Sequence, residues 1–341
     1  MGIIEATNLT KAFWVASHRR GALGALRGLV DRSGREVRAV DAVTFAVSAG
    51  ELVGFIGPNG AGKSTTIKML TGILVPSAGD ATVAGLVPWR QRQVLARRIG
   101  VVFGQRTQLW WDLPLIESLE LLRYIYRVPA DRFGANLDEI RALLELDPFL
   151  ETPVRQLSLG QRMRGDLAAA LLHEPPILYL DEPTIGLDVV AKARVREFLA
   201  RLNRDRGVTV LLTTHDLADV EYLCRRILII DHGRLLFDGE IEEIRRRYGT
   251  HRTLVVDLDE EGEPAGRHDG QETFDWPGVE LTRIDGPRCW LRFDRERVSA
   301  ADLIAAVSSR YRVRDVAIEE PAIEEIVRRI YASGVGLMND S

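Results

Sequence analysis

The stretch that decides the fold is Gly57-Pro58-Asn59-Gly60-Ala61-Gly62-Lys63-Ser64, which matches the phosphate-binding pattern G-x-x-x-x-G-K-[ST]. It follows the apolar run Val53–Gly57, which predicts a buried strand, and it opens a predicted helix, Lys63–Thr71. Glycines let backbone N–H groups turn inward around phosphate oxygens, and the helix N-terminus adds positive potential. Lys63 would then reach the β- and γ-phosphates of a nucleotide, and the Ser64 hydroxyl would bind Mg²⁺.

Two carboxylates stand directly after a second apolar run. Ile177–Leu180 predicts a buried strand, and Asp181 and Glu182 follow it. At the carboxyl edge of a sheet, Asp181 could hold Mg²⁺ through water, and Glu182 could polarise the water that attacks a phosphate. Helix capping or simple solvation is the alternative for an acidic pair at a strand end. Together with the phosphate loop, the pair favours a nucleotide triphosphatase.

Strand and helix patterns alternate through the first 250 residues. Further helices are predicted at Ile116–Tyr126, Leu137–Glu145, Gln161–His173 and Val189–Arg204, and further strands at Ile3–Leu9, Val40–Val47, Gly100–Phe103, Val208–Thr213 and Ile227–Ile230. Such alternation indicates an α/β fold with a parallel sheet covered on both faces. Residues 14–38 are rich in Gly and Arg and predict a solvated insertion, with a phosphate- or lipid-facing patch as the alternative.

The composition changes near residue 250. Residues 251–341 carry 12 Arg and 19 acidic residues, a net charge of −7, which leaves +3 of the total −4 for residues 1–250. Short strands are predicted at Thr253–Leu258, Glu280–Ile284, Cys289–Phe293 and Arg312–Ile318, and helices at Ala300–Ser309 and Pro321–Tyr331. We therefore expect a nucleotide-binding domain over residues 1–249 and a small α+β accessory domain over residues 250–341.

The overall composition excludes several classes of protein. With 45 basic and 49 acidic residues in 341, the chain gives no electrostatic reason to expect nucleic acid as its partner. Its longest stretches without Asp, Glu, Lys or Arg are 11 residues, whereas a membrane-spanning helix needs about 20 apolar residues. The two distant cysteines favour reduced thiols. Lysine is rare, at four positions: Lys11, Lys63, Lys68 and Lys192.

From about Ile3 to Gly249 the sequence resembles the ATP-binding cassette (ABC) ATPases. The motifs that carry the resemblance are Gly57–Thr65, Gln105, Leu157-Ser158-Leu159-Gly160-Gln161, Leu180–Pro183, Gly186-Leu187-Asp188 and His215. The five-residue signature at Leu157 distinguishes cassettes from other phosphate-loop enzymes. It departs from the family at Leu159, where Gly is usual. The resemblance implies a parallel-sheet core, an antiparallel β part and a helical subdomain, with ATP and Mg²⁺ as ligands.

The resemblance also implies roles for single residues. Phe13 would stack on adenine, with a core-facing position as the alternative, and Thr65 would support the α-phosphate. Gln105 would contact Mg²⁺ or water and sense a neighbouring membrane domain. His215 would touch the γ-phosphate, and Asp188 would lie in a loop that crosses to a partner subunit.

The signature implies a second cassette. Ser158, Gly160 and the amides at the start of the Gln161 helix would close over a γ-phosphate bound by another copy. One phosphate loop and one signature are present, so the pair would be a homodimer or a dimer with a related chain. ATP binding would close this head-to-tail pair around two nucleotides, and hydrolysis would release it.

The segment Leu157–Arg164, the tryptophans Trp110 and Trp111 and the insertion together resemble exporters of the ABC-2 type, related to viologen and drug efflux. The acidic tail resembles the small accessory domain at the end of many such exporter ATPases. These resemblances imply a separate transmembrane permease and a peripheral position at the cytoplasmic face of the cell membrane. A core role is the alternative for the two tryptophans. The alternative functions are a soluble cassette acting on nucleic acid or ribosomes, and a regulatory module; intact Lys63 and Glu182 argue against a regulator that does not hydrolyse ATP.

Overall fold

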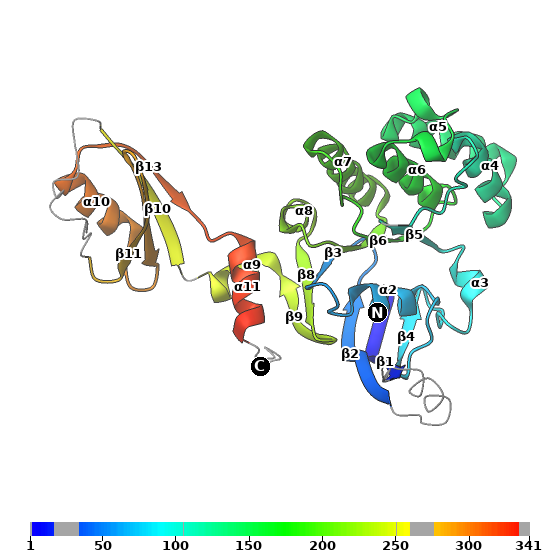
Figure 1. The fold of residues 1–341 in the computed structure, drawn as a ribbon, viewed down its shortest axis with the longest axis horizontal. Coiled ribbons are helices and arrows are strands. Elements are labelled where there is room, and N and C mark those ends of the chain that lie inside the picture. The colour runs from blue at the N-terminus through cyan, green and yellow to red at the C-terminus, as the bar shows by residue number, and fades with distance from the viewer. Residues whose placement is uncertain (1, 17–33, 105, 250, 260–275, 334–341) are drawn as a thin grey trace, which may run out of the picture. The chain divides into compact units, whose positions relative to one another are not determined.

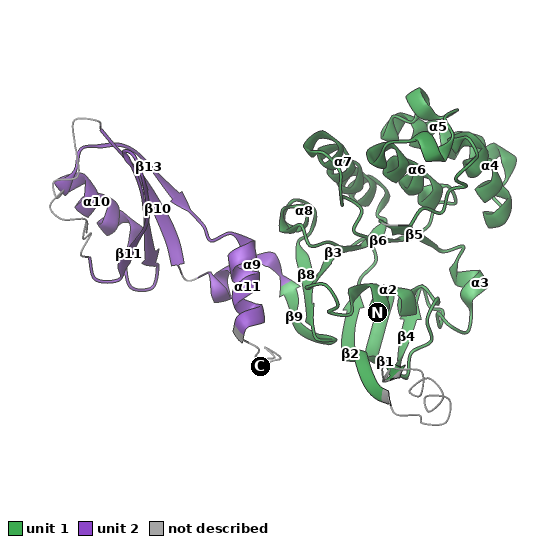
Figure 2. Ribbon diagram, in the orientation of Figure 1, with its two compact units in different colours: residues 1–239, 335–341 green, residues 240–334 purple. Residues whose placement is uncertain are grey.

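The computed structural model describes residues 2–16, 34–104, 106–249, 251–259 and 276–333. These residues form two compact units that divide between residues 239 and 240 (Figure 2). Helix α9 (Ile241–Tyr248) belongs to the second unit, because it packs on that unit's helix α11 (Ile323–Ser333). The division between the compact units therefore lies about ten residues before the domain boundary predicted at residue 249. That domain boundary stays a prediction.

The first unit is built on a six-stranded sheet with the strand order β5-β6-β7-β3-β8-β9. Its strands are β3 (Leu52–Ile56), β5 (Ile99–Phe103), β6 (Ile177–Asp181), β7 (Thr209–Thr213), β8 (Arg226–Asp231) and β9 (Arg234–Glu240). The pairs β5/β6, β6/β7, β3/β7 and β3/β8 are parallel, which confirms the predicted parallel sheet. Parallel strands end at one edge, so the segments after β3, β6 and β7 lie close together.

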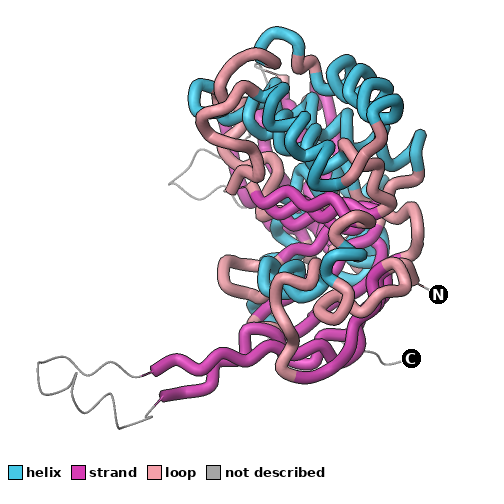
Figure 3. The backbone as a smooth tube through the Cα atoms, turned by 90° about the vertical axis from the view of Figure 1, so that its right-hand side faces the viewer, coloured by secondary structure: helices cyan, strands magenta, loops and turns pink. Residues whose placement is uncertain are grey.

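A second sheet of the same unit has the order β2-β1-β4, with β1 (Ile4–Ala16), β2 (Gly34–Val47) and β4 (Ala78–Val83). Figure 3 shows β1 and β2 as a long two-stranded ribbon. Both strands reach into the insertion predicted at residues 14–38, while residues 17–33 lie outside the described residues. Register shifts between Ala6 and Leu9 and between Leu9 and Lys11 break the alternation of side chains. The strand predicted from the sequence therefore ends at Leu9, whereas β1 continues to Ala16.

The helices of this unit are α2 (Lys63–Leu70), α3 (Arg92–Leu95), α4 (Leu115–Tyr126), α5 (Ala130–Leu144), α6 (Leu159–Leu171), α7 (Val189–Arg206) and α8 (Leu217–Leu223), with 3₁₀ turns at Asp147–Phe149 and Val154–Gln156. Helices α4, α5 and α6 group together, apart from the antiparallel sheet (Figure 1). Helix α5 begins before the predicted Leu137, because tertiary packing buries Phe133 and Asn136. No helix among the described residues is long and apolar enough to cross a bilayer.

One apolar core joins the two sheets of the first unit. Ile4 and Phe45 of the antiparallel sheet cluster with Phe55 and Ile230 of the parallel sheet and with Ile67 of α2. All five side chains are at most 4% exposed. Helix α2, which starts at the phosphate loop, is thus anchored on both sheets by burial of apolar surface.

The second unit is a small α+β structure. Its antiparallel sheet has the order β11-β12-β10-β13, with β10 (His251–Leu258), β11 (Val279–Asp285), β12 (Arg288–Asp294) and β13 (Val313–Glu319). Helix α10 (Ala300–Arg310) covers one face, where Leu303 and Val307 pack on Leu254, Leu291 and Phe293. The expected α+β fold of this unit is confirmed.

Candidate functional site

The phosphate loop, Gly57–Ser64, connects β3 to α2 as predicted. Gly62 has φ +112°, and a Cβ on it would lie 2.5 Å from the carbonyl oxygen of Ala39. A Cβ on Gly57 would lie 2.3 Å from the carbonyl oxygen of Ile230. Both glycines are therefore required by close backbone approaches, and Gly62 is also required by its left-handed conformation.

Lys63 and Ser64 begin the helix that follows the loop. The Lys63 ammonium group donates hydrogen bonds to the carbonyl oxygens of Gly57 at 2.5 Å and Pro58 at 3.1 Å. Burial lowers the pKa of Lys63, and the charges of Glu182 and Asp181 oppose this effect. The Ser64 hydroxyl donates to Oδ1 of Asp181 at 3.2 Å. The first helical turn therefore faces the two carboxylates at the end of β6.

The carboxylates are held by the last residue of β7 and by a residue that follows it. Thr213 donates its hydroxyl hydrogen to Oδ1 of Asp181 at 2.5 Å. Nδ1 of His215 lies 2.6 Å from Oε2 of Glu182, whose side chain is 18% exposed. Glu182 also has φ +60°, a left-handed conformation that costs a non-glycine residue about 1 kcal/mol or more and recurs at functional sites. The strained backbone places the Glu182 side chain beside His215.

These groups surround one cleft of about 750 Å³, a volume suited to a nucleotide. It is lined by Gly57, Pro58, Asn59, Gly60, Ala61, Gly62, Lys63, Ser64, Thr65, Asp181, Glu182 and His215, all predicted from the sequence, and by Lys68, Ile73, Phe103, Gly104, Arg106 and Ile185, which were not. Gly104 and Arg106 flank Gln105, which lies outside the described residues. Gly104 and Arg106 follow β5, whose carboxyl end lies at the same sheet edge as that of β6. This position could have identified both residues as part of the site from the sequence.

Phe13 does not line this cleft. The residue is 39% exposed, which excludes the core-facing alternative, and the Lys11 ammonium lies 5.3 Å from the centre of its ring. Stacking of Phe13 on adenine stays a prediction.

The signature residues form the start of α6. The Ser158 hydroxyl accepts a hydrogen bond from the Gln161 amide at 3.2 Å, and Oε1 of Gln161 accepts one from the Ser158 amide at 2.9 Å. This capping box satisfies two backbone N–H groups at the start of α6 and fixes its first turn. Ser158, Gly160 and Gln161 do not line the cleft that contains the phosphate loop of the same chain.

The structure accounts for the unusual Leu159. A Cβ on Gly186, where φ is +70°, would lie 2.6 Å from Cδ2 of Leu159. The leucine side chain therefore occupies space that Gly186 leaves open. Nearby, Oδ1 of Asp188 accepts a hydrogen bond from the Ala191 amide at 2.9 Å and caps α7. Leu159 joins the signature to the loop that ends at Asp188.

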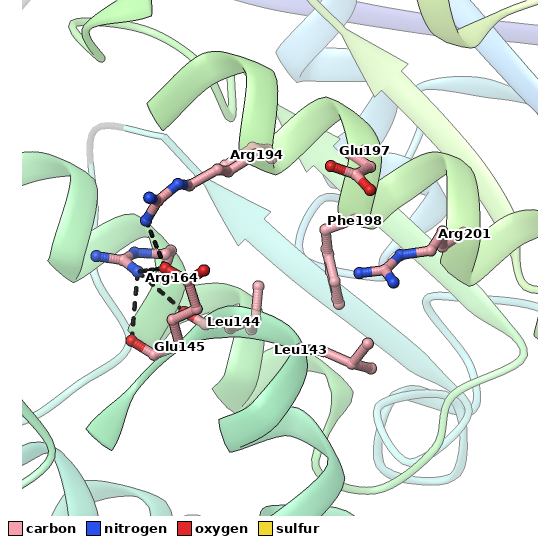
Figure 4. Close-up of a pocket in the computed structure, with 9 residues that line it drawn as sticks. Leu143, Leu144, Glu145, Arg164, Arg194, Glu197, Phe198 and Arg201 are labelled. Carbon is pink, nitrogen blue, oxygen red and sulfur yellow. Dashed lines mark hydrogen bonds and ion pairs between the residues drawn. The ribbon is translucent and has the colours of Figure 1, made fainter. Parts of the chain in front are cut away.

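A small cavity of about 70 Å³ lies between α5, α6 and α7 (Figure 4). There Arg164 of the signature helix donates to the carbonyl oxygen of Leu144 at 3.1 Å, and Arg194 of α7 pairs with Glu145. The cavity is far smaller than a nucleotide pocket. Its paired charges indicate a joint between three helices rather than a ligand site.

Comparisons with known proteins agree with this geometry. A family model described as "ABC transporter" matches residues 40–185. The chain is 34% identical over 299 residues to a daunorubicin resistance ATP-binding protein of Streptomyces coeruleorubidus, covering 85% of this chain and 90% of the relative. It is 33% identical over 208 residues to the ABC transporter ATP-binding protein NatA of Bacillus subtilis (strain 168), covering 61% of this chain and 84% of the relative.

Solved structures show the same likeness. The dimeric structure of a post-hydrolysis state of an ATP-binding cassette bound to ADP and Pi superposes with a TM-score of 0.59 at 26% identity, covering 70% of this chain and 98% of that one. The phosphate loop, the two carboxylates, the histidine and these relatives lead to one assignment. The chain belongs to the ABC transporter family, as an ATP-binding subunit that hydrolyses ATP.

Proposed function

We propose that the chain is the ATPase subunit of an ABC-2 type exporter, which dimerises head-to-tail around two MgATP and drives a separate permease. The observation that carries the proposal is the cleft that unites the phosphate loop with Asp181, Glu182 and His215. The daunorubicin resistance protein, similar over nearly its whole length, supports a role in export. On this proposal, the protein is peripheral at the cytoplasmic face of the membrane through its permease.

The hydrolytic residues are Glu182, His215 and Lys63. Water attacks the γ-phosphorus of ATP, the bond to the bridging oxygen breaks, and Glu182 accepts the proton from the water. His215, already hydrogen-bonded to Glu182, contacts the γ-phosphate and holds the base in place. Lys63 turns its ammonium group from the loop carbonyls toward the β- and γ-phosphates, where it stabilises the charge of the transition state.

The donor set fits a magnesium ion. The Ser64 hydroxyl and the Asp181 carboxylate, 3.2 Å apart, are hard oxygen ligands of the kind that Mg²⁺ prefers. The described residues contain no cluster of three or more His, Cys, Asp or Glu that could hold a metal alone, which suits an ion that keeps waters and phosphate oxygens as ligands. When bound there, Mg²⁺ would neutralise charge on the β- and γ-phosphates. Gln105 stays a predicted third contact.

The position of the signature supports the proposed dimer. Ser158, Gly160 and Gln161 lie outside the cleft of their own chain, yet they form an ordered helix N-terminus suited to phosphate oxygens. In a head-to-tail pair, the signature of one copy would close the nucleotide site of the other. Asp188 would then lie at the interface.

The dimer is tested with Glu182→Gln, which keeps the hydrogen-bonding shape but removes the base. With saturating MgATP, this full-length variant should run as a dimer in size-exclusion chromatography with light scattering and should hydrolyse ATP at least about 100-fold more slowly. Glu120→Gln changes an exposed glutamate of α4 and is the matched control. A Glu182→Gln protein that stays monomeric with bound ATP would rule out the dimer mechanism.

The permease contact is proposed at an exposed apolar surface. Trp110 is 38% exposed and Trp111 is 50% exposed, which excludes the core alternative, and exposed Leu121, Tyr124 and Ile125 follow on α4. Exposed apolar clusters of this kind mark interaction sites. We expect the full chain to co-purify with a membrane protein from detergent-solubilised membranes, and a Trp110→Ala/Trp111→Ala variant to lose it. An ATP-hydrolysing preparation that never contains a membrane protein would exclude the exporter.

A further inference from the structure

Helix α7 connects the loop ending at Asp188 to two other segments of the site. Lys192 forms an ion pair with Oδ2 of Asp216 at 2.7 Å. One turn further along α7, Nε of Arg196 donates to Oδ1 of Asp219 at 2.5 Å. Asp219 is fully buried and also accepts a hydrogen bond from the Thr184 hydroxyl.

These contacts attach α7 to the segments next to Glu182 and His215. Asp216 is the neighbour of His215, and Thr184 follows Glu182 by two positions. The His215 side chain is 60% exposed, so its place depends strongly on how the adjacent backbone is held. Asp216 is bound locally to Thr214 and to the start of α8. Two residues of α7 also pair with it, Lys192 at 2.7 Å and Arg196 at 3.8 Å, so Lys192 is its nearer partner on that helix.

The contacts occupy one side of α7. Lys192 and Arg196 are four residues apart, the spacing that places side chains on one helix face. Arg194 instead reaches Glu145 at the joint between the helices, as Figure 4 shows. The two sides of α7 therefore contact different parts of the protein: Lys192 and Arg196 pair with Asp216 and Asp219, whereas Arg194 pairs with Glu145.

We propose that Lys192 is a positioning residue for ATP hydrolysis, which holds His215 against Glu182 through its ion pair with Asp216. Because α7 begins directly after Asp188, the same pair transmits the position of that loop to His215. The inference rests on the roles proposed for Glu182 and His215. The Lys192 and Asp216 side chains are only 28% and 24% exposed, and a partly buried pair is screened less than a surface pair.

The test is steady-state ATP hydrolysis by the full chain. Lys192 does not line the cleft, so Lys192→Met should lower kcat about tenfold or more and leave the KM for ATP within about twofold. Lys192→Arg, which keeps the charge, should restore most of kcat. Asp216→Asn keeps an oxygen to cap α8 and should lower kcat in the same way. The double variant should be no slower than the slower single variant, because Asp216→Asn already removes the ion pair that Lys192→Met removes.

The matched control is Arg206→Met, which removes another ion pair of α7, that of Arg206 with Glu139. It should keep kcat within about twofold. The inference is overturned if Lys192→Met and Asp216→Asn both keep normal kcat, if their effects multiply in the double variant, or if Arg206→Met loses as much. An active Glu182→Gln protein would instead contradict the proposed function itself, so the two failures are distinguishable.

Discussion

Asp166 is a buried carboxyl whose replacement should stabilise the protein. It lies in the signature helix α6 and is only 6% exposed. Its Oδ1 accepts hydrogen bonds from the Thr107 hydroxyl at 2.8 Å and from the Gln108 amide at 3.1 Å. Burial raises the pKa of Asp166 to about 6, outweighing the lowering effects of Thr107, Gln108 and the charge of Arg162. Asn at this position keeps the accepting oxygen and carries no charge.

The direction of the pH dependence follows from the raised pKa. An acid whose pKa is higher in the folded than in the unfolded state contributes stability below its unfolded pKa, near 3.8. That contribution is lost as the pH rises through about 6. A shift of about two units at about 1.4 kcal/mol per unit makes the charged Asp166 cost about 3 kcal/mol at pH 8, and only about 1 kcal/mol at pH 4.5.

We therefore expect Asp166→Asn to raise the free energy of unfolding by about 2–3 kcal/mol at pH 8, allowing for an amide group without a partner. The advantage should shrink to about 1 kcal/mol or less at pH 4.5. Urea unfolding followed by circular dichroism measures both values. Asp112→Asn, at an exposed pair with Arg155, is the control and should change stability by less than about 1 kcal/mol. A less stable Asp166→Asn protein at pH 8, or an equal gain at both pH values, would refute the reasoning.

Two further substitutions test the phosphate loop and the signature. Lys63→Ala should weaken binding of a fluorescent ATP analogue at least about tenfold, because it removes the buried ammonium group of the loop; unchanged affinity would remove Lys63 from the site. Gly186→Ala should destabilise the chain by about 1–3 kcal/mol in urea, because its Cβ meets Leu159 and φ is positive. Adding Leu159→Ala should recover part of that loss, and no recovery would contradict the packing of Leu159 on Gly186.

The phosphate loop and the two carboxylates could be predicted because each depends on residues that are neighbours in the sequence. The phosphate loop needs glycines, Lys63 and Ser64 at fixed spacing between a strand and a helix, and all of these are neighbours in the chain. Asp181 and Glu182 could be placed because an apolar run identifies a buried strand and therefore its end. The unpredicted lining residues Ile73 and Ile185 sit in loops without a pattern of their own.

Other features depended on packing that no local pattern contains. The start of α5 was missed because Phe133 and Asn136 are buried by contacts that periodicity does not specify. The end of β1 and the start of β2 were missed because bulges interrupt the alternation of side chains. Phe13 and the two tryptophans could be placed either in the core or at the surface until the structure showed them exposed.

The sequence by itself determined the parallel sheet, the phosphate loop and the order of the motifs, because side-chain periodicity and short spacings act within one element. Only the tertiary structure decided which elements meet: His215 beside Glu182, Leu159 over Gly186 and Lys192 on Asp216. Each of these contacts joins residues more than 20 positions apart. Such contacts form only when the core closes, because burial of apolar surface brings the helices and strands together without regard to their separation in sequence.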